Sequence, residues 1–138
     1  MKQEPKFSTV MLIDDNEIDN LINQKMIESL NFCSNILIHS GAKSALEYLK
    51  NIDRIKHGAE NYLPELIFLD IDMPIMDGFQ FLEEFEKMSD TVKNVSKIVL
   101  LTSSLDPKDI SKSKSNKFIH KFINKPLSQE ALSKFLGA

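Results

Sequence analysis

The chain has 138 residues, of which 42% are hydrophobic, so it has the size of one domain and enough apolar side chains for a core. Its formal net charge of −3, without a block of lysine or arginine, gives no electrostatic case for binding nucleic acid or an anionic membrane. The first apolar run is short and stops at Asp14, which is not typical of a signal peptide or a membrane span. We therefore expect a cytoplasmic protein with a single domain over residues 1–138.

The first half of the chain predicts two strand and helix pairs. A strand pattern over 7–13 precedes a helical pattern over 17–30, whose apolar side chains share one face, as in a helix that packs on a sheet. These side chains are Ile18, Leu21, Ile22 and Met26. A second strand is predicted over 32–39 and a second helix over 41–57. The polar stretch Arg54–Pro64 predicts a long loop to which we assign no function.

The second half repeats the alternation three more times. A strand over 66–69 precedes a helix that Asp77 can cap, and a polar connection over 88–97 leads to a strand over 98–101. Asp106-Pro107 is typical of a helix start, but the segment Lys108–Lys117 has few apolar anchors and predicts a weakly packed helix. A last strand over 120–124 and a last helix over 128–136 follow. Five alternations predict an α/β sandwich around a parallel sheet.

Polar residues follow four of the predicted strands. Asp14 and Asp15 end the first, Asp70 the third, Thr102 the fourth and Lys125 the fifth. Because the carboxyl ends of parallel strands meet at one edge of a sheet, we expect these side chains to converge there. Carboxylate oxygens are ligands that Mg²⁺ prefers, and three carboxylates together repel each other unless a cation neutralises them. The sequence therefore predicts a site for a divalent cation and a phosphoryl group.

A carboxylate at such an edge can attack a phosphoryl group and form an aspartyl phosphate. Asp70 is the best candidate because it ends the most apolar of the strands. Lys125 can pair with a phosphoryl oxygen and Thr102 can donate a hydrogen bond to another. Taken alone, Thr102 is an ordinary strand residue and Lys125 an ordinary surface cation. Gly78, which follows Asp70 by eight positions, allows a close approach of the backbone.

These motifs together resemble the receiver domain of bacterial two-component response regulators. They are DD after the first strand, D-x-D-M-P-x-M-D-G after the third, T-S after the fourth and K-P after the fifth, and the resemblance runs from about residue 9 to 136. It implies a flavodoxin-like (βα)5 three-layer sandwich with strand order 2-1-3-4-5. It implies that Asp70 accepts phosphate from a sensor histidine kinase or a histidine phosphotransfer protein. It also implies a cis peptide bond before Pro126.

The resemblance implies further roles at this edge. Mg²⁺ would be bound by the side chains of Asp15 and Asp70, by the backbone carbonyl of Asp72, and by Asp14 mostly through water. Thr102 would move toward the phosphate and Phe122 would turn inward, although the family often has a tyrosine there. Asp72 and Ser104 would tune the phosphate lifetime. The affected surface is that of the fourth helix, fifth strand and fifth helix of the family.

We expect a signalling phosphoacceptor with self-catalysed phosphorylation and dephosphorylation rather than an enzyme. A stand-alone receiver would act by binding an unknown output protein or by passing phosphate onward, as a monomer or a phosphorylation-dependent dimer. The alternative is a haloacid dehalogenase-like phosphatase, in which Asp70 would be the nucleophile and Asp72 the general acid. The order of the motifs disfavours that class, because here the acidic pair precedes the D-x-D strand and only Glu130 follows Lys125 as an acidic residue.

Overall fold

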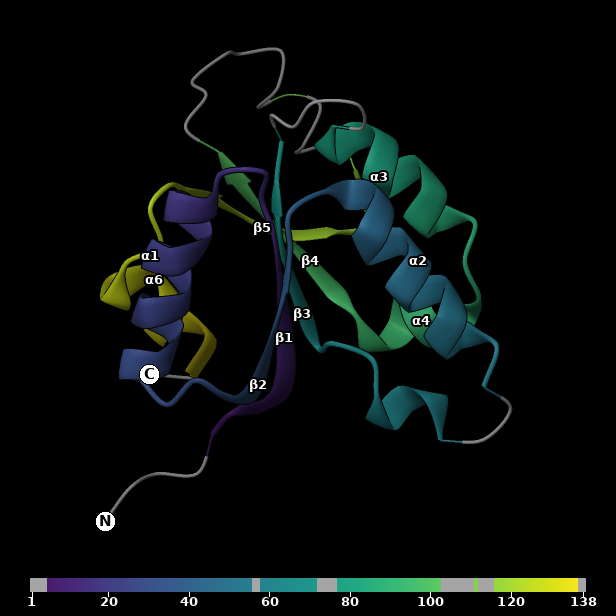
Figure 1. Ribbon diagram of the computed structural model, residues 1–138, viewed down its shortest axis with the longest axis horizontal. Helices are drawn as coiled ribbons and strands as arrows, with labels where there is room; N and C mark the ends of the chain where they lie inside the picture. Colours follow the sequence, from purple (N-terminus) through teal and green to yellow (C-terminus); the bar gives the residue numbers. More distant parts are fainter. Residues whose placement is uncertain (1–4, 56–57, 72–76, 103–110, 112–115, 137–138) are drawn as a thin grey trace.

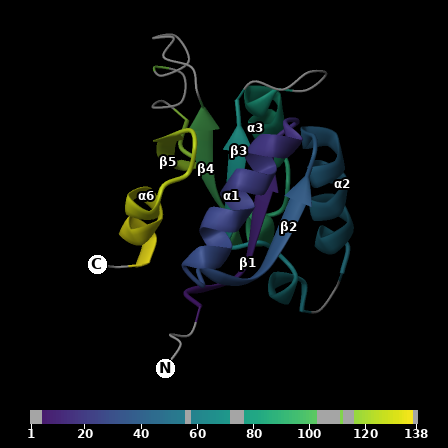
Figure 2. The same ribbon diagram turned by 60° about the vertical axis from the view of Figure 1, so that its left-hand side comes forward.

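Five parallel strands form one sheet in the order β2-β1-β3-β4-β5 (Figure 2). The computed structural model describes residues 5–55, 58–71, 77–102, 111 and 116–136. The strands are β1 (Phe7–Ile13), β2 (Cys33–His39), β3 (Leu66–Asp70), β4 (Lys97–Thr102) and β5 (Ile119–Asn124). The predicted flavodoxin-like sandwich with strand order 2-1-3-4-5 is confirmed.

Helices cover both faces of the sheet (Figure 1). On one side lie α1 (Glu17–Ser29) and α6 (Gln129–Ser133), which continues as the 3₁₀ turn η2 (Lys134–Leu136). On the other side lie α2 (Ala42–Asp53), α3 (Gly78–Glu86) and α4 (Asp90–Val95), and a short 3₁₀ turn, η1 (Ala59–Asn61), precedes β3. No helix in the described part of the chain is long and apolar enough to cross a membrane.

The central strands β1, β3 and β4 divide the core into two halves by simple alternation of their side chains. Met11 and Ile13 pack with α2 and α3, whereas Val10 and Leu12 pack on the side of α1 and α6. All five residues of β3 are buried, as expected of a central strand covered on both faces. This burial holds β3, whose last residue is Asp70, in a fixed position.

Two expectations about the connecting segments need correction. The polar connection expected over 88–97 contains the helix α4, which Ser89 caps by accepting the N–H of Val92. The sequence shows no helical pattern of apolar residues here, because α4 has only six residues and buries one of them, Val92. The second helix ends at Asp53 and does not extend to residue 57 as expected. At its end the Asp53 carboxylate accepts a 2.6 Å hydrogen bond from the Ser89 hydroxyl. Most of the weak helix expected over Lys108–Lys117 lies outside the described residues.

Helix α1 is placed as expected, but most of its predicted apolar face does not pack on the sheet. Ile18, Leu21 and Ile22 are 68%, 52% and 46% exposed, and the buried residues of the helix are Asn20, Asn23 and Ile27. Three of the four side chains predicted to share a face are thus exposed, because Asn20 and Asn23 of this helix turn inward to form hydrogen bonds at the carboxyl edge of the sheet, and only Met26 packs against the core.

Gly78 allows α3 to start directly against the end of β3, as predicted. A Cβ at this position would lie 2.9 Å from the carbonyl oxygen of Asp70 and 3.0 Å from Cα of Ile71. Both are backbone atoms, and the N–H of Gly78 donates to the carbonyl of Ile71. A side chain would therefore displace the backbone that carries Asp70.

We expect Gly78→Ala to destabilise the protein by about 1–3 kcal/mol, because the extra methyl group overpacks a backbone contact that cannot relax freely. Urea unfolding followed by circular dichroism measures this. Gly41→Ala is the control for the added methyl group, since nothing lies within 4 Å of a Cβ there, and because Gly41 is the N-cap of α2 we expect a smaller loss of about 1 kcal/mol. Equal losses in the two variants would contradict the argument.

Candidate functional site

Three carboxylates meet at the carboxyl edge of the sheet, as predicted. The register pairs Ile13 of β1 with Leu69 of β3, so Asp14 and Asp70 follow in adjacent positions. One oxygen from each of Asp14, Asp15 and Asp70 lies within 4.8 Å of the others. Asp14 and Asp70 are buried, at 2% and 3% exposure, whereas Asp15 is exposed. The two buried charges require compensation.

Lys125, which directly follows β5, supplies that compensation from the far side of the sheet. Its Nζ lies 2.5 Å from Oδ2 of Asp14 and 3.2 Å from Oδ1 of Asp70. The backbone N–H of Lys125 donates to the carbonyl oxygen of Thr102, at 2.9 Å, which fixes the start of this side chain against the end of β4. The Lys125-Pro126 peptide bond is cis, as expected.

The environment of Lys125 keeps its side chain charged. Burial disfavours the ammonium and acts to lower the pKa, but the hydrogen bond with Asp14 and the charges of Asp70 and Asp14 raise it more, so that the pKa of Lys125 lies above its usual range. A raised lysine pKa stabilises the folded protein fully at any pH below the ordinary pKa of lysine. This stabilisation is lost only as the pH rises through the pKa of Lys125 in the folded protein. The ion pairs therefore persist throughout the neutral range.

Three asparagines near the start of α1 hold the site in place. Asn16 caps the helix, and its N–H donates to Oδ1 of Asp14 at 2.9 Å. The side-chain amide of Asn20 donates to the carbonyl of Asp14 at 2.8 Å, and Oδ1 of Asn23 accepts the N–H of Leu127 at 3.1 Å. Helix α1 thus links the end of β1 to the segment that follows Lys125.

Asp19 is a fourth carboxylate that the sequence reasoning missed. Its Oδ2 lies 3.2 Å from Nζ of Lys125, and its side chain is 37% exposed. The pattern that would have revealed it is the polar repeat of Asn16, Asp19, Asn20 and Asn23, which falls at helical spacing along one face of α1. Lys125 therefore contacts three carboxylates from three different elements.

The remaining predicted residues are placed only in part. Thr102 ends β4 and is fully buried beside the strand that Lys125 directly follows. Phe122 is half-buried and packs against the core half that contains α2 and α3. Asp72, Ser104 and the loop between Asp72 and Asp77 lie outside the described residues.

The residues present fit a Mg²⁺ ion. All three clustered groups are carboxylates, which are the hard oxygen donors that this cation prefers, and their oxygens are close enough to share one ion. Asp15 is open to solvent, so water can complete the coordination. The sulfur and imidazole ligands that softer metals prefer are not part of the cluster.

Comparison with known proteins agrees with this geometry. A family model described as the response regulator receiver domain matches residues 10–136. The probable methanogenesis regulatory protein FilR2 of Methanothrix harundinacea is 30% identical over 125 residues, which are 91% of this chain and 76% of that protein. The sensor histidine kinase CheAY of Helicobacter pylori is 31% identical over 132 residues, 96% of this chain but only 15% of that protein. A two component response regulator from Cytophaga hutchinsonii superposes with a TM-score of 0.84, at 29% identity and 96% coverage of both chains.

We expect Lys125→Met to lower the free energy of unfolding by about 3 kcal/mol without metal, because it leaves two buried carboxylates without their cation. Chemical unfolding in EDTA measures the loss. Repeating it with millimolar MgCl₂ should recover much of the loss, because the metal then carries the missing positive charge.

Lys43→Met is the matched control, since Lys43 is exposed on α2, and we expect it to change stability by less than about 0.5 kcal/mol. A Lys125→Met protein as stable as the control, or one that MgCl₂ does not stabilise, would contradict the role assigned to this lysine.

Proposed function

Because the chain belongs to the response regulator receiver domain family, we propose that Asp70 accepts a phosphoryl group from a phosphohistidine in a Mg²⁺-dependent step. The observation that carries the proposal is the position of Lys125. Its ammonium lies 3.2 Å from Oδ1 of Asp70, within a cluster of carboxylates that fits a cation. A positive charge fixed beside the acceptor oxygen is what a transferring phosphoryl group requires.

In this proposal a carboxylate oxygen of Asp70 attacks the phosphorus, and the bond to the histidine nitrogen breaks, so that imidazole leaves. Lys125 exchanges its contact with Asp70 for one with a phosphoryl oxygen. The Thr102 hydroxyl donates a hydrogen bond to a second oxygen. A bound Mg²⁺ would neutralise the charge shared by the carboxylates and the phosphoryl group. Self-catalysed hydrolysis of the aspartyl phosphate would return the chain to its resting state.

The output is proposed to run through β5. Thr102 and Phe122 lie on adjacent strands, and Phe122 packs against the core, so a displacement of Thr102 toward a phosphate would change the packing of Phe122. The affected face would include β5 and α6, as well as residues before β5 that the structure does not describe. Asp72 and Ser104 are proposed to tune the lifetime of the phosphate. The consequence would be binding of an output protein or onward transfer of phosphate.

Family membership favours the receiver over the haloacid dehalogenase-like phosphatase that shares the D-x-D pattern. In the phosphatase, Asp72 would act as a general acid on a small substrate. In the receiver, the substrate is a phosphohistidine on another protein. A surface beside Asp70 for that protein is therefore part of the proposal.

The exposed apolar face of α1 fits this role. Ile18, Leu21 and Ile22 lie on the helix whose Asp19 contacts Lys125, and Ile38 of β2 is also exposed, at 42%. Between α1 and β2 runs a groove of about 530 Å³ whose lining includes Ile18, Leu21 and Ile38. Exposed apolar side chains gathered beside a reactive group are typical of a protein interaction site. We propose that the phosphohistidine donor docks here.

We expect wild-type protein to gain the mass of one phosphoryl group on incubation with acetyl phosphate and MgCl₂, and Asp70→Asn to gain none. Intact-protein mass spectrometry measures this. Asp90→Asn, at a carboxylate whose side chain is 94% exposed on α4, should be labelled like wild type. Labelling of Asp70→Asn, or labelling that is unchanged in EDTA, would refute the assignment of the acceptor or of its metal dependence.

We expect Leu21→Ser to slow phosphotransfer from a phosphorylated histidine phosphotransfer domain by about tenfold, which is a loss of roughly 1.4 kcal/mol of docking energy. Labelling by acetyl phosphate should not change, because Leu21 lines the groove between α1 and β2 and is not part of the carboxylate cluster. Rapid-quench kinetics with both donors measure the two rates.

Ile55→Ser, at an apolar residue of 40% exposure just after α2, is the control and should leave both rates unchanged. Equal slowing with both donors would mean that Leu21→Ser damages the site itself. Unchanged transfer from the protein donor would place the docking surface elsewhere.

A further inference from the structure

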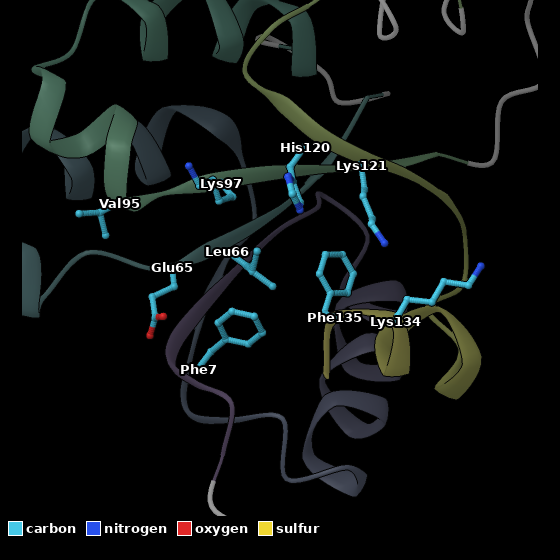
Figure 3. Close-up of a pocket in the computed structure, with 9 residues that line it drawn as sticks. All are labelled: Phe7, Glu65, Leu66, Val95, Lys97, His120, Lys121, Lys134 and Phe135. Atoms are coloured by element: carbon cyan, nitrogen blue, oxygen red, sulfur yellow. The ribbon is translucent and has the colours of Figure 1, made fainter. Parts of the chain in front are cut away.

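A pocket of about 430 Å³ lies at the amino ends of the strands, opposite the edge that carries Asp70 (Figure 3). Leu66 and Lys97 begin β3 and β4, and His120 and Lys121 are the second and third residues of β5. Phe7 begins β1, and Phe135 belongs to η2. The pocket is therefore independent of the carboxylate cluster, and the proposed function assigns it no role.

Its apolar surface is an extension of the core. Phe7 packs edge-on against Phe32 at 5.0 Å between ring centroids, and Phe135 packs edge-on against Phe68 at 6.4 Å. Phe7, Phe135 and Leu66 belong to the apolar part of the pocket lining (Figure 3). Rings held by the core in this way present a rigid surface on which a flat apolar group can stack.

The charges around these rings are mainly positive, although the whole chain is acidic. Lys97, Lys121 and Lys134 line the pocket with Glu65 as the single acidic side chain of its lining. Glu65 already accepts the N–H of Ser8, at 2.6 Å. Among the described residues, none of the three lysines forms an ion pair with a carboxylate.

Lys121 brings a positive charge next to the aromatic surface of the pocket. Its Nζ lies 4.8 Å from the centroid of the Phe135 ring, and the His120 ring lies 6.2 Å from the same ring. In Figure 3 both side chains extend from β5 toward Phe135. An ammonium that rests on an aromatic face gains less than one paired with an anion, so it is free to take an anionic partner.

We propose that this pocket binds a small aromatic anion, whose ring packs against Phe7 beside Phe135 and whose charged group pairs with Lys121. The volume lies within the range of about 300–1,000 Å³ that is usual for small-molecule sites. The Lys121 ammonium beside this apolar floor selects for an anion with a flat apolar body over a neutral ligand of the same shape. The expected ligand class is an aromatic carboxylate, sulfonate or phosphate.

The test is a titration of ¹⁵N-labelled protein with two probes, 1-naphthalenesulfonate and the neutral 1-naphthalenemethanol, followed by ¹H–¹⁵N correlation spectra. We expect saturable shifts at the amides of Leu66, Lys97, Lys121 and Phe135 with the sulfonate, and binding of the neutral probe that is at least tenfold weaker. No Mg²⁺ or phosphodonor is needed, so the result does not depend on the function of Asp70.

Lys121→Gln should weaken binding of the sulfonate about fivefold or more and leave the neutral probe unaffected, because the substitution removes charge and keeps most of the side-chain stem. Lys121→Met is a second variant for use if Lys121→Gln does not fold, and it should weaken binding of the sulfonate to a similar extent because it also removes the charge. Lys25→Gln, at an exposed lysine of α1, is the control and should bind like wild type.

Three results would overturn the proposal. They are an absence of saturable shifts at these amides, equal affinity for the two probes, and shifts centred on Leu21 and Ile38 in the groove beside α1.

Discussion

The burial of two carboxylates at the end of the sheet is the constraint on which the site depends. Asp14 and Asp70 are almost fully buried, and unpaired charges at such positions cost several kcal/mol. The compensating ammonium of Lys125 comes from the end of β5, and β4 separates β5 from the strand of Asp70. The outer strand is thus joined to the centre of the sheet in two ways, by the backbone hydrogen bond from Lys125 to Thr102 and by the ion pair between Lys125 and Asp70. The same arrangement places a cation within reach of any group bound to Asp70.

This constraint also explains the unusual orientation of α1. The helix directs Asn20 and Asn23 inward, where they hold the end of β1 and the segment after Lys125. A helix that turns its asparagines toward the sheet must turn its opposite face outward, and that face carries Ile18, Leu21 and Ile22. The apolar surface beside the site is therefore a structural consequence of how the carboxylates are held, and its position makes it suitable for a partner protein.

Sequence patterns predicted the parts of the molecule in which local and tertiary preferences agree. The strands β1, β3 and β4 are continuous apolar runs, and such runs are buried in any parallel sheet, so the positions of Asp14, Asp70 and Thr102 followed from them. The facing of α1 could not be predicted from hydrophobicity, because hydrogen bonds to the sheet edge decide it. Asp19 was missed for the same reason, since its contact with Lys125 depends on which face of α1 turns inward. The helix α4 is too short to show a period.

Two lysines with different surroundings belong to β5 and its end, since Lys121 lies within the strand and Lys125 directly follows it. Lys125 lies among the carboxylates at the carboxyl edge of the sheet, and Lys121 lies over Phe135, about 13 Å away along the extended chain. Phe122 lies between them and packs against the core. A strand is stiff along its length, so a shift of β5 that accompanied a new contact at Lys125 would also move Lys121 relative to Phe135. A ligand held by Lys121 would then favour one position of β5. By linkage, the ligand would change the free energy of the proposed phosphorylation at Asp70 by the same amount as that phosphorylation changes the free energy of ligand binding.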